Sequence, residues 1–287
     1  MKDGVLNIKI VTDSTCDLPE DILKQYDITS VPVIINMDGV SYQDGVNMTR
    51  AEFYERLPNC KILPTTSAPN IDAFKKVYEK VSRAGIKQIL SIHVSEALSS
   101  TIQMARLAAE ELRDASITVI DSGQISLGTG FIAREAAKIA SEGLKIGEIL
   151  ARLEEFKTRV HVLAVVDTLE YLMRSGRMSR ALGGLGTIFN IKPILKMHQG
   201  EPTVERVRTH GRASRRLIEL MANLAPFEDL AIVHTSNLRG AKKLMYQMSG
   251  LFPGLQKPWI VDVTPAIGVH LGPGVAGFAC IQCVKEA

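Results

Sequence analysis

The sequence of 287 residues is poor in aromatic side chains and in net charge, and it has no long apolar run. Aromatic residues make up 5% of the chain, the formal net charge is +3, and no long stretch of Lys or Arg occurs, so we expect no binding of nucleic acid. No apolar run approaches the ~20 residues that a membrane-spanning helix needs. The N-terminal MKDGVLNIKIVTDST has no charged leader before an apolar stretch, so we expect no signal peptide.

Cysteine is also scarce. The four cysteines are Cys16, Cys60, Cys280 and Cys283. The last two form a CxxC within GFACIQCV, which has the pattern of a strand, and residues three apart on a strand point to opposite faces. A redox CxxC normally opens a helix, and a zinc site needs a second pair of ligands. We therefore expect reduced packing residues, no metal and a cytoplasmic protein.

Several catalytic and cofactor motifs are missing as well. The phosphate loop GxxxxGK[ST], the metal motif HExxH and the hydrolase motif GxSxG do not occur, and the glycines of GQISLGTG lack the spacing of a dinucleotide-binding loop. The six histidines are scattered along the chain. These absences favour binding over catalysis, and they predict no cofactor.

The order of strand-like and helix-like segments predicts two domains. In residues 1–160, nearly continuous apolar strands such as KQILSIHVS and SITVIDS alternate with helices, which is typical of a parallel, doubly wound α/β sheet covered on both faces. TSVPVIIN is expected to be one strand, followed by a turn or hairpin at DGVSYQDG. In residues 161–287, KPILKMHQGEPTVERVRT has the pattern of an antiparallel hairpin among helices and further strands, which predicts an α+β domain.

Three segments of the first half carry hydroxyl side chains that could contact a ligand. Ser95 follows the strand KQILSIHV, and we expect a helix to begin within one or two residues. Ser95 therefore caps that helix, contacts an anion at its N-terminus, or does both. Thr65, Thr66 and Ser67 lie between two prolines, either in a ligand-holding loop or in a solvated turn. The segment VTDSTCD ends the first strand and either lines the same crevice or caps the next helix.

A single histidine, His270, lies in TPAIGVHLGPGVAG, which we expect to be a glycine-rich loop. The glycines allow the backbone to approach another group closely. Together with the hydroxyls, an imidazole suits a carboxylate or a phosphate as ligand. A buried, structurally satisfied histidine is the alternative interpretation.

The chain resembles the DegV family of bacterial lipid-binding proteins over nearly its full length. The resemblance lies in VTDSTCDLP, YQDGVNMTRAEFYERL, TTSAP, SIHVSEALSSTIQ, VIDSGQISLGTG, LEYLMRSGRMSR, NIKPIL, GEPTVERVRT and IGVHLGPG. It implies a two-domain α/β protein that buries a long-chain fatty acid between its domains. It also implies a partner, the ATP-binding subunit of fatty acid kinase, which phosphorylates the presented carboxyl group for phospholipid synthesis.

The resemblance further implies a ligand-binding set. The carboxyl-binding threonine of the family falls on Thr66, beside Ser67; its serine falls on Ser95 and its histidine on His270. Glu96 stands where the family often has glycine, and a carboxylate there would repel the ligand unless it points outward. Leu271 replaces a frequent threonine, and further departures fall on Ala68, Asn70, Ser100 and Ile102.

The remaining expectations concern partners and alternatives. GGLGTIFNIKPILKM and AIGVHLGPGVAG offer aliphatic and small residues for an acyl tunnel, or an ordinary core. Arg174, Arg177 and Arg180 are spaced to share one helix face, either solvated or docking the kinase subunit or, transiently, a membrane; Arg174 and Arg177 are our partner-facing candidates. Two other functions remain open: a hydrolase or acyltransferase that uses Ser95 with His270, and a binding module for another small anion.

Overall fold

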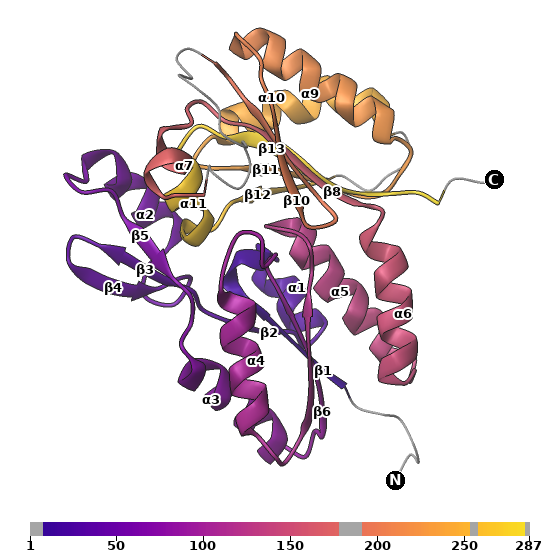
Figure 1. Cartoon of the computed structure of the whole chain (residues 1–287). Helices are drawn as coiled ribbons and strands as arrows, with labels where there is room; N and C mark the ends of the chain where they lie inside the picture. The colour runs from indigo at the N-terminus through magenta and orange to yellow at the C-terminus, as the bar shows by residue number, and fades with distance from the viewer. Residues whose placement is uncertain (1–7, 178–190, 253–257, 285–287) are drawn as a thin grey trace.

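The computed structural model describes residues 8–177, 191–252 and 258–284, and Figure 1 shows the arrangement of its elements. Four strands form a parallel sheet in the order β2-β1-β6-β7. Their bounds are β1 (Ile8–Asp13), β2 (Thr29–Val31), β6 (Gln88–His93) and β7 (Ser116–Asp121). The predicted parallel sheet of the first half is therefore confirmed.

Helices cover both faces of this sheet. On one face, Val11 and Ile89 pack against α3 (Ile71–Arg83) and α4 (Thr101–Glu111). On the other face, Ile10 and Leu90 pack against α5 (Leu127–Ser141), beside α1 (Glu20–Gln25) and α6 (Ile146–Lys157). Because successive strand residues face opposite layers and both layers are apolar, the strands are almost continuously hydrophobic.

A small antiparallel sheet stands beside the parallel sheet, with strand order β4-β3-β5. It contains β3 (Ile34–Met37), β4 (Val40–Gln43) and β5 (Thr65–Ser67), and α2 (Arg50–Arg56) follows the predicted hairpin. The expectation of one strand over TSVPVIIN is wrong, because the segment divides at Pro32 and its two halves join different sheets. Proline has no amide hydrogen with which to continue a ladder.

The second half forms a mixed six-stranded sheet in the order β10-β9-β8-β13-β11-β12. Its strands are β8 (Val160–Val165), β9 (Ile194–His198), β10 (Glu201–Glu205), β11 (Phe227–His234), β12 (Trp259–Asp262) and β13 (Ala276–Gln282). The predicted hairpin is β9–β10. Helices α9 (His210–Leu224) and α10 (Leu238–Met248) cover one face, and two short helices, α7 (Glu170–Arg174) and α11 (Pro265–Leu271), lie beyond its strand ends.

Helix α5 lies between the two large sheets. Its Phe131 belongs to one apolar cluster that contains Leu90 of the parallel sheet as well as Ala231 and Ala279 of the six-stranded sheet. The main core is thus shared by both halves of the chain. A division into domains 1–160 and 161–287 remains a proposal; β8, the first strand of the second sheet, begins at Val160.

Two local expectations near the predicted site are wrong. The helix expected directly after Ser95 begins only at Thr101, because the backbone carbonyl of Ser95 first closes a turn by accepting the amides of Leu98 and Ser99. The expected loop around His270 is the helix α11, with a proline in its first turn and Gly272 at its end at φ 71°. Proline at the start and glycine just past the end are helix boundary signals that fit this segment.

Candidate functional site

A cavity lies where the parallel sheet meets the six-stranded sheet. On one side it is lined by residues that follow parallel strands, including Thr15 and Val94, and on the other by Val162, Met197 and Val233 of the six-stranded sheet. Most of the described residues that line it are aliphatic. This is the crevice beyond the carboxyl ends of parallel strands, where α/β sheets commonly bind ligands.

Thr66 and His270 form a polar pair in the wall of this cavity. The hydroxyl of Thr66 and Nε2 of His270 are 2.9 Å apart, although the two residues are 204 positions apart in the chain. Thr66 is placed by the short strand β5, and His270 by the last turn of α11. Leu271, the next residue, also lines the cavity and adds apolar surface beside the pair.

The imidazole of His270 is neutral at neutral pH. Burial, and next to it the positive charge of Arg177, lowers the pKa of His270 from 6.5 to about 4. Its Nδ1 is buried and has no hydrogen-bond partner. We assign the proton to Nε2, since a buried N–H without an acceptor is rarer than a buried lone pair without a donor. In that tautomer Nε2–H donates to the Thr66 oxygen, which leaves the Thr66 hydroxyl free to donate to a ligand anion.

The other two predicted ligand-binding residues lie elsewhere. Ser67 is exposed and accepts a hydrogen bond from Asn36 Nδ2 at 3.1 Å, because successive strand residues point to opposite faces. Ser95 is fully buried, its hydroxyl accepts the amide of Ala97 at 3.3 Å, and it is not among the described residues that line the cavity. The structure thus brings Thr66 and His270 together and leaves Ser67 and Ser95 outside the described wall.

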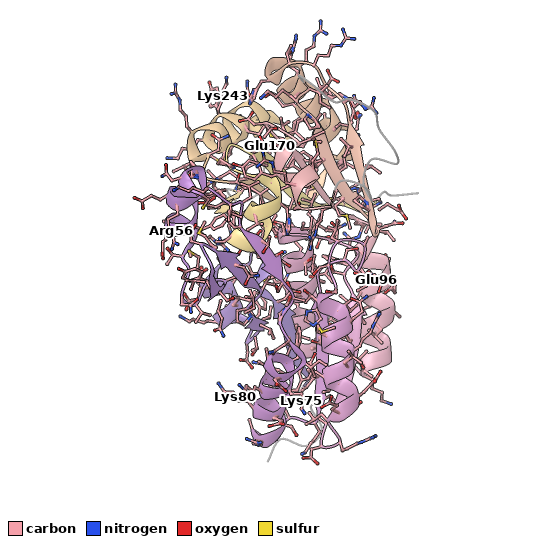
Figure 2. The ribbon with its side chains drawn as sticks, turned by 60° about the vertical axis from the view of Figure 1, so that its left-hand side comes forward. Arg56, Lys75, Lys80, Glu96, Glu170 and Lys243 are labelled. Carbon is pink, nitrogen blue, oxygen red and sulfur yellow. The ribbon has the colours of Figure 1, made fainter. Side chains whose placement is uncertain are left out.

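Glu96 does not point at the cavity. Its side chain is at the surface, as Figure 2 shows, and accepts a hydrogen bond from Arg106 at 3.2 Å. The repulsion that its position next to Ser95 suggested therefore does not arise from this side chain.

The two arginine candidates differ in their surroundings. Arg174 ends α7 and forms an exposed ion pair with Glu170 at 2.8 Å. Arg177 lines the cavity, and its Nη1 donates to the carbonyl of Ser175 at 2.7 Å. The expectation of one shared helix face is wrong for these two, because α7 ends at Arg174 and Gly176 follows at φ 71°. Arg180 and most of GGLGTIFNIKPILKM lie outside the described residues.

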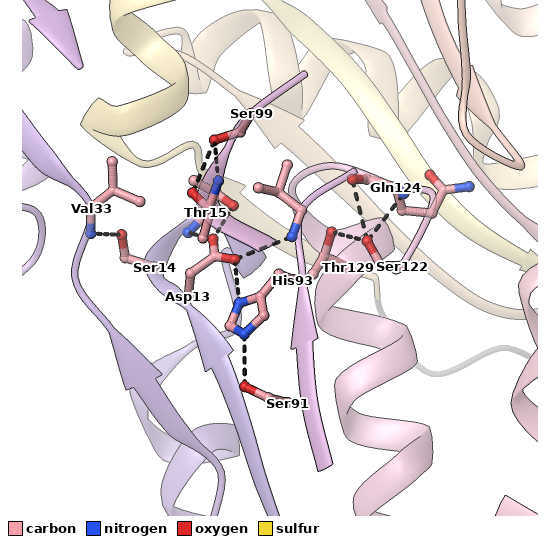
Figure 3. Close-up of polar contacts among 12 residues, drawn as sticks. Asp13, Ser14, Thr15, Val33, Ser91, His93, Ser99, Ser122, Gln124 and Thr129 are labelled. Atoms are coloured by element: carbon pink, nitrogen blue, oxygen red, sulfur yellow. Dashed lines mark hydrogen bonds and ion pairs between the residues drawn. The ribbon is translucent and has the colours of Figure 1, made fainter. Parts of the chain in front are cut away.

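A buried aspartate that was not predicted from the sequence, Asp13, supports two residues of the cavity wall, Thr15 and Val94. Asp13 Oδ1 accepts from the amide and hydroxyl of Thr15, and its Oδ2 contacts His93 Nδ1 at 3.0 Å and the amide of Val94 at 3.1 Å (Figure 3). Burial opposes ionisation, but the contacts with His93, Thr15 and Val94 prevail and lower the pKa of Asp13. Its place at the end of a strand, within VTDSTCD, was the available signal.

A group of buried side chains is arranged like a catalytic triad but is not accessible to a substrate from the described cavity wall. It consists of Ser91, His93 and Asp13. His93 Nε2 lies 2.7 Å from the Ser91 hydroxyl, which in turn lies 2.8 Å from the hydroxyl of Tyr78. All four side chains are fully buried, and Ser91 is not among the described residues that line the cavity. No substrate reaches this serine from the cavity wall that the structure describes, so the arrangement gives no support to a hydrolase.

Two absences among the described residues bear on other functions. Within residues 8–177, 191–252 and 258–284, no three or more His, Cys, Asp and Glu side chains are grouped so that they could hold a metal ion. Over the same part of the chain, every helix is too short or too polar to cross a membrane.

Comparisons with known proteins agree on one family. Residues 7–282 match the model described as "Uncharacterised protein, DegV family". A DegV domain-containing protein of Caldanaerobacter subterraneus subsp. tengcongensis is 34% identical over 276 residues, which cover 94% of this chain and 97% of that protein. The structure is similar to a fatty-acid-binding DegV family protein from Thermus thermophilus, with a TM-score of 0.86, 30% identity and coverage of 96% of this chain and 99% of that one. It is also similar to DegV, a fatty acid binding protein from Bacillus subtilis, with a TM-score of 0.87, 29% identity and coverage of 96% and 100%.

Proposed function

The chain belongs to the DegV family, and from that premise we propose that it binds a long-chain fatty acid in the cytoplasm and presents its carboxyl group to a separate kinase subunit. The observation that carries the proposal is an aliphatic cavity with the Thr66–His270 pair in its wall. The fatty acid binding of the Thermus thermophilus and Bacillus subtilis relatives supports it.

The cavity suits the acyl chain energetically. Burial of one methylene is worth ~0.8 kcal/mol, so full burial of a sixteen-carbon chain is worth on the order of 10 kcal/mol. The described wall contributes aliphatic side chains from the six-stranded sheet, such as Val162 and Leu195, and from the segments beside both large sheets, such as Ile125 and Val275. A chain of methylenes needs no specific partner, because burial of apolar surface has no preferred direction.

The polar pair suits the carboxylate. The Thr66 hydroxyl donates to one carboxylate oxygen, and His270 fixes the direction of that hydroxyl. In the proposed reaction, a carboxylate oxygen attacks the γ-phosphorus of ATP on the partner subunit, the bond to ADP breaks, and this chain keeps the acyl phosphate. The chain supplies binding and orientation rather than a nucleophile. Arg174 and Arg177 remain our candidates for contact with the kinase subunit or, transiently, with a membrane.

Mass spectrometry of the purified protein tests the fatty acid. We expect a mass increment under native conditions that disappears on denaturation, together with a free fatty acid in the extract. An increment that survives denaturation would point to covalent chemistry, and a protein that is empty and takes up no added fatty acid would contradict the proposal.

Two neighbouring substitutions test the head-group assignment. We expect Thr66→Val to lower the affinity for a fatty acid about tenfold or more, since one hydrogen bond to a charged group is lost. Ser67→Ala is the matched control, because it removes a hydroxyl from the same strand on the opposite, exposed face. Acyl phosphate formation by a kinase subunit should fall with Thr66→Val and not with Ser67→Ala. Equal behaviour of the two variants would refute the assignment.

A further inference from the structure

Two buried carboxylates hold one threonine at the start of α11. Asp17 Oδ1 accepts the amide of Thr264 at 2.8 Å, and Asp44 Oδ2 accepts its hydroxyl. Asp44 also accepts the hydroxyl of Ser14 at 2.7 Å, and Asp17 accepts that of Ser126 at 2.5 Å. Asp17 is 1% exposed and Asp44 3%, so segments from three distant parts of the chain meet at groups that water does not reach.

The same stretch is held by two further side chains of the N-terminal half. Arg50 Nη1 donates to the carbonyl of Asp262 at 2.5 Å, and the hydroxyl of Tyr54 donates to the carbonyl of Val263 at 2.9 Å. Tyr54 also packs against α11 at Gly268, where a Cβ would lie 2.5 Å from the tyrosine oxygen. The three residues that precede α11 are therefore fixed to α2 and to the segments that follow β1 and β4, rather than to their own sheet alone.

This arrangement is costly for the fold. Burial of a carboxylate is unfavourable unless hydrogen bonds and opposite charges compensate it. Arg50 is 3.3 Å from Asp17, but Asp44 Oδ1 has no hydrogen-bond partner. Burial raises the pKa of Asp17 to about 6, despite Arg50 and the donors to it, and it raises the pKa of Asp44 as well. A threonine at a helix start needs only its own side chain as a cap, so two buried acids exceed what capping requires.

Helix α11 connects Thr264, which precedes its first residue, to His270 in its last turn. It has only seven residues, and its far end is fixed where the hydroxyl of Thr235 donates to the carbonyl of Gly272 at 2.7 Å. His270 lies in the last turn, 2.9 Å from Thr66. Small displacements of a hydrogen-bonding group weaken the bond steeply, so the pair depends on where the helix begins.

We propose that Thr264, held by Asp17 and Asp44, is a positioning residue for the Thr66–His270 pair and thereby sets the preference of the cavity for a carboxylate over an uncharged head group. This inference rests on the proposed function. It assigns the selectivity to residues that are not among the described wall of the cavity.

The test compares two ligands with the same tail, palmitate and hexadecanol, by their dissociation constants. Tail burial is common to both, so the ratio of their affinities reports the head group alone. We expect Thr264→Val, which keeps the shape but removes the hydroxyl, to lower the preference for palmitate about tenfold or more. Thr264→Ser keeps the hydroxyl and should keep the ratio. Thr129→Val is the matched control, since Thr129 is fully buried and its hydroxyl shares one hydrogen bond with Ser122 at 3.0 Å.

The outcomes of these measurements decide whether Thr264 positions the Thr66–His270 pair. An unchanged ratio in folded Thr264→Val, or an equal loss in Thr129→Val, would overturn the positioning role. If Thr264→Val does not fold, Asp44→Asn and Asp44→Ala replace it. Asn keeps a hydrogen-bond acceptor for Thr264 and should keep the affinity ratio of palmitate to hexadecanol, whereas Ala should lower this ratio. Equal ratios in the two variants would overturn the positioning role. If the wild type binds neither ligand, the proposed function is wrong. The positioning role is then decided by the ring-nitrogen NMR signals of His270, which should shift in Thr264→Val and stay in Thr129→Val.

Discussion

The burial of His270 predicts a pH-dependent stability whose sign and size follow from the structure. The pKa of His270 is lowered to about 4, first by burial and then by the charge of Arg177, whereas an unfolded chain has the ordinary value of 6.5. Between these values the unfolded state binds a proton that the folded state does not, so the free energy of unfolding rises with pH. The difference in pKa corresponds to a contribution of about 3 kcal/mol, complete above about pH 7 and lost towards about pH 4.

Other groups titrate in the same window, so the wild-type curve alone does not isolate His270. The pKa of His161 is also lowered to about 4, by burial and the neighbouring His198, and acts with the same sign. The pKa of Asp17 is raised to about 6, and it acts with the opposite sign. The informative quantity is therefore the difference in unfolding free energy between the wild type and His270→Gln.

Urea unfolding at pH values from about 4.5 to about 7 measures this difference. We expect the wild type minus His270→Gln to rise by about 2 kcal/mol or more across the range. His161→Gln is the matched control. The pKa of His161 is lowered equally and for the same main reason, so its difference in unfolding free energy should change with pH in the same direction. His161 is, however, not among the described residues that line the cavity.

A bound fatty acid separates the two histidines. A carboxylate near the pair favours the protonated imidazole, so palmitate should raise the pKa of His270 measured by NMR and leave that of His161 unchanged. A flat difference curve, or a pKa of His270 near 6.5 in the free protein, would refute the burial argument. Equal shifts of both histidines on ligand addition would refute the placement of the head group.

Two further predictions concern the surroundings of α11. The folded state keeps a proton on Asp17 between pH 3.8 and about 6, so its contribution to stability falls as pH rises, and the wild type minus Asp17→Asn should fall by about 3 kcal/mol between about pH 3.5 and about pH 7 in urea unfolding. Gly272→Ala should cost about 2 kcal/mol or more, measured by thermal unfolding, because Gly272 has φ 71° and a Cβ there would lie 2.3 Å from the ring of Tyr171. Gly143→Ala, at φ 78° with no atom within 4 Å, should cost less, and equal losses would contradict the steric part.

The large elements were predictable because their signal is long and redundant. The apolar residues of β6 and β7 are divided between two apolar layers, so several residues of each strand indicate the same structure. The hairpin β3–β4 was predictable from Asp38-Gly39, whose φ angles of 53° and 76° suit a tight two-residue turn. The split of TSVPVIIN was not predicted, since one proline decides it against a favourable apolar pattern on both sides.

The candidate site was predictable only in its parts. Thr66 and His270 stood out for separate reasons, but their separation of 204 residues leaves their distance to the tertiary fold. α11 was missed because seven residues with glycine carry too little periodic pattern, although the proline at its start and Gly272 at its end were visible. The contacts of Thr264 were not predictable, because a threonine before a proline gives no sign that two aspartates from elsewhere in the chain will contact it.

The magnitudes show why such supporting contacts matter in a site of this kind. Burial of a long acyl chain supplies on the order of 10 kcal/mol, whereas one charge-assisted hydrogen bond supplies about 2 kcal/mol. On the proposed function, the aliphatic wall of the cavity therefore supplies most of the affinity, and any apolar tail of similar size gains equally. Discrimination between head groups rests on the smaller contribution of the hydrogen bond. This contribution is lost when the donor moves by a fraction of the hydrogen-bond length. In the positioning role that we propose for Thr264, α11 is hydrogen-bonded at both ends and preserves this contribution by holding His270 in place.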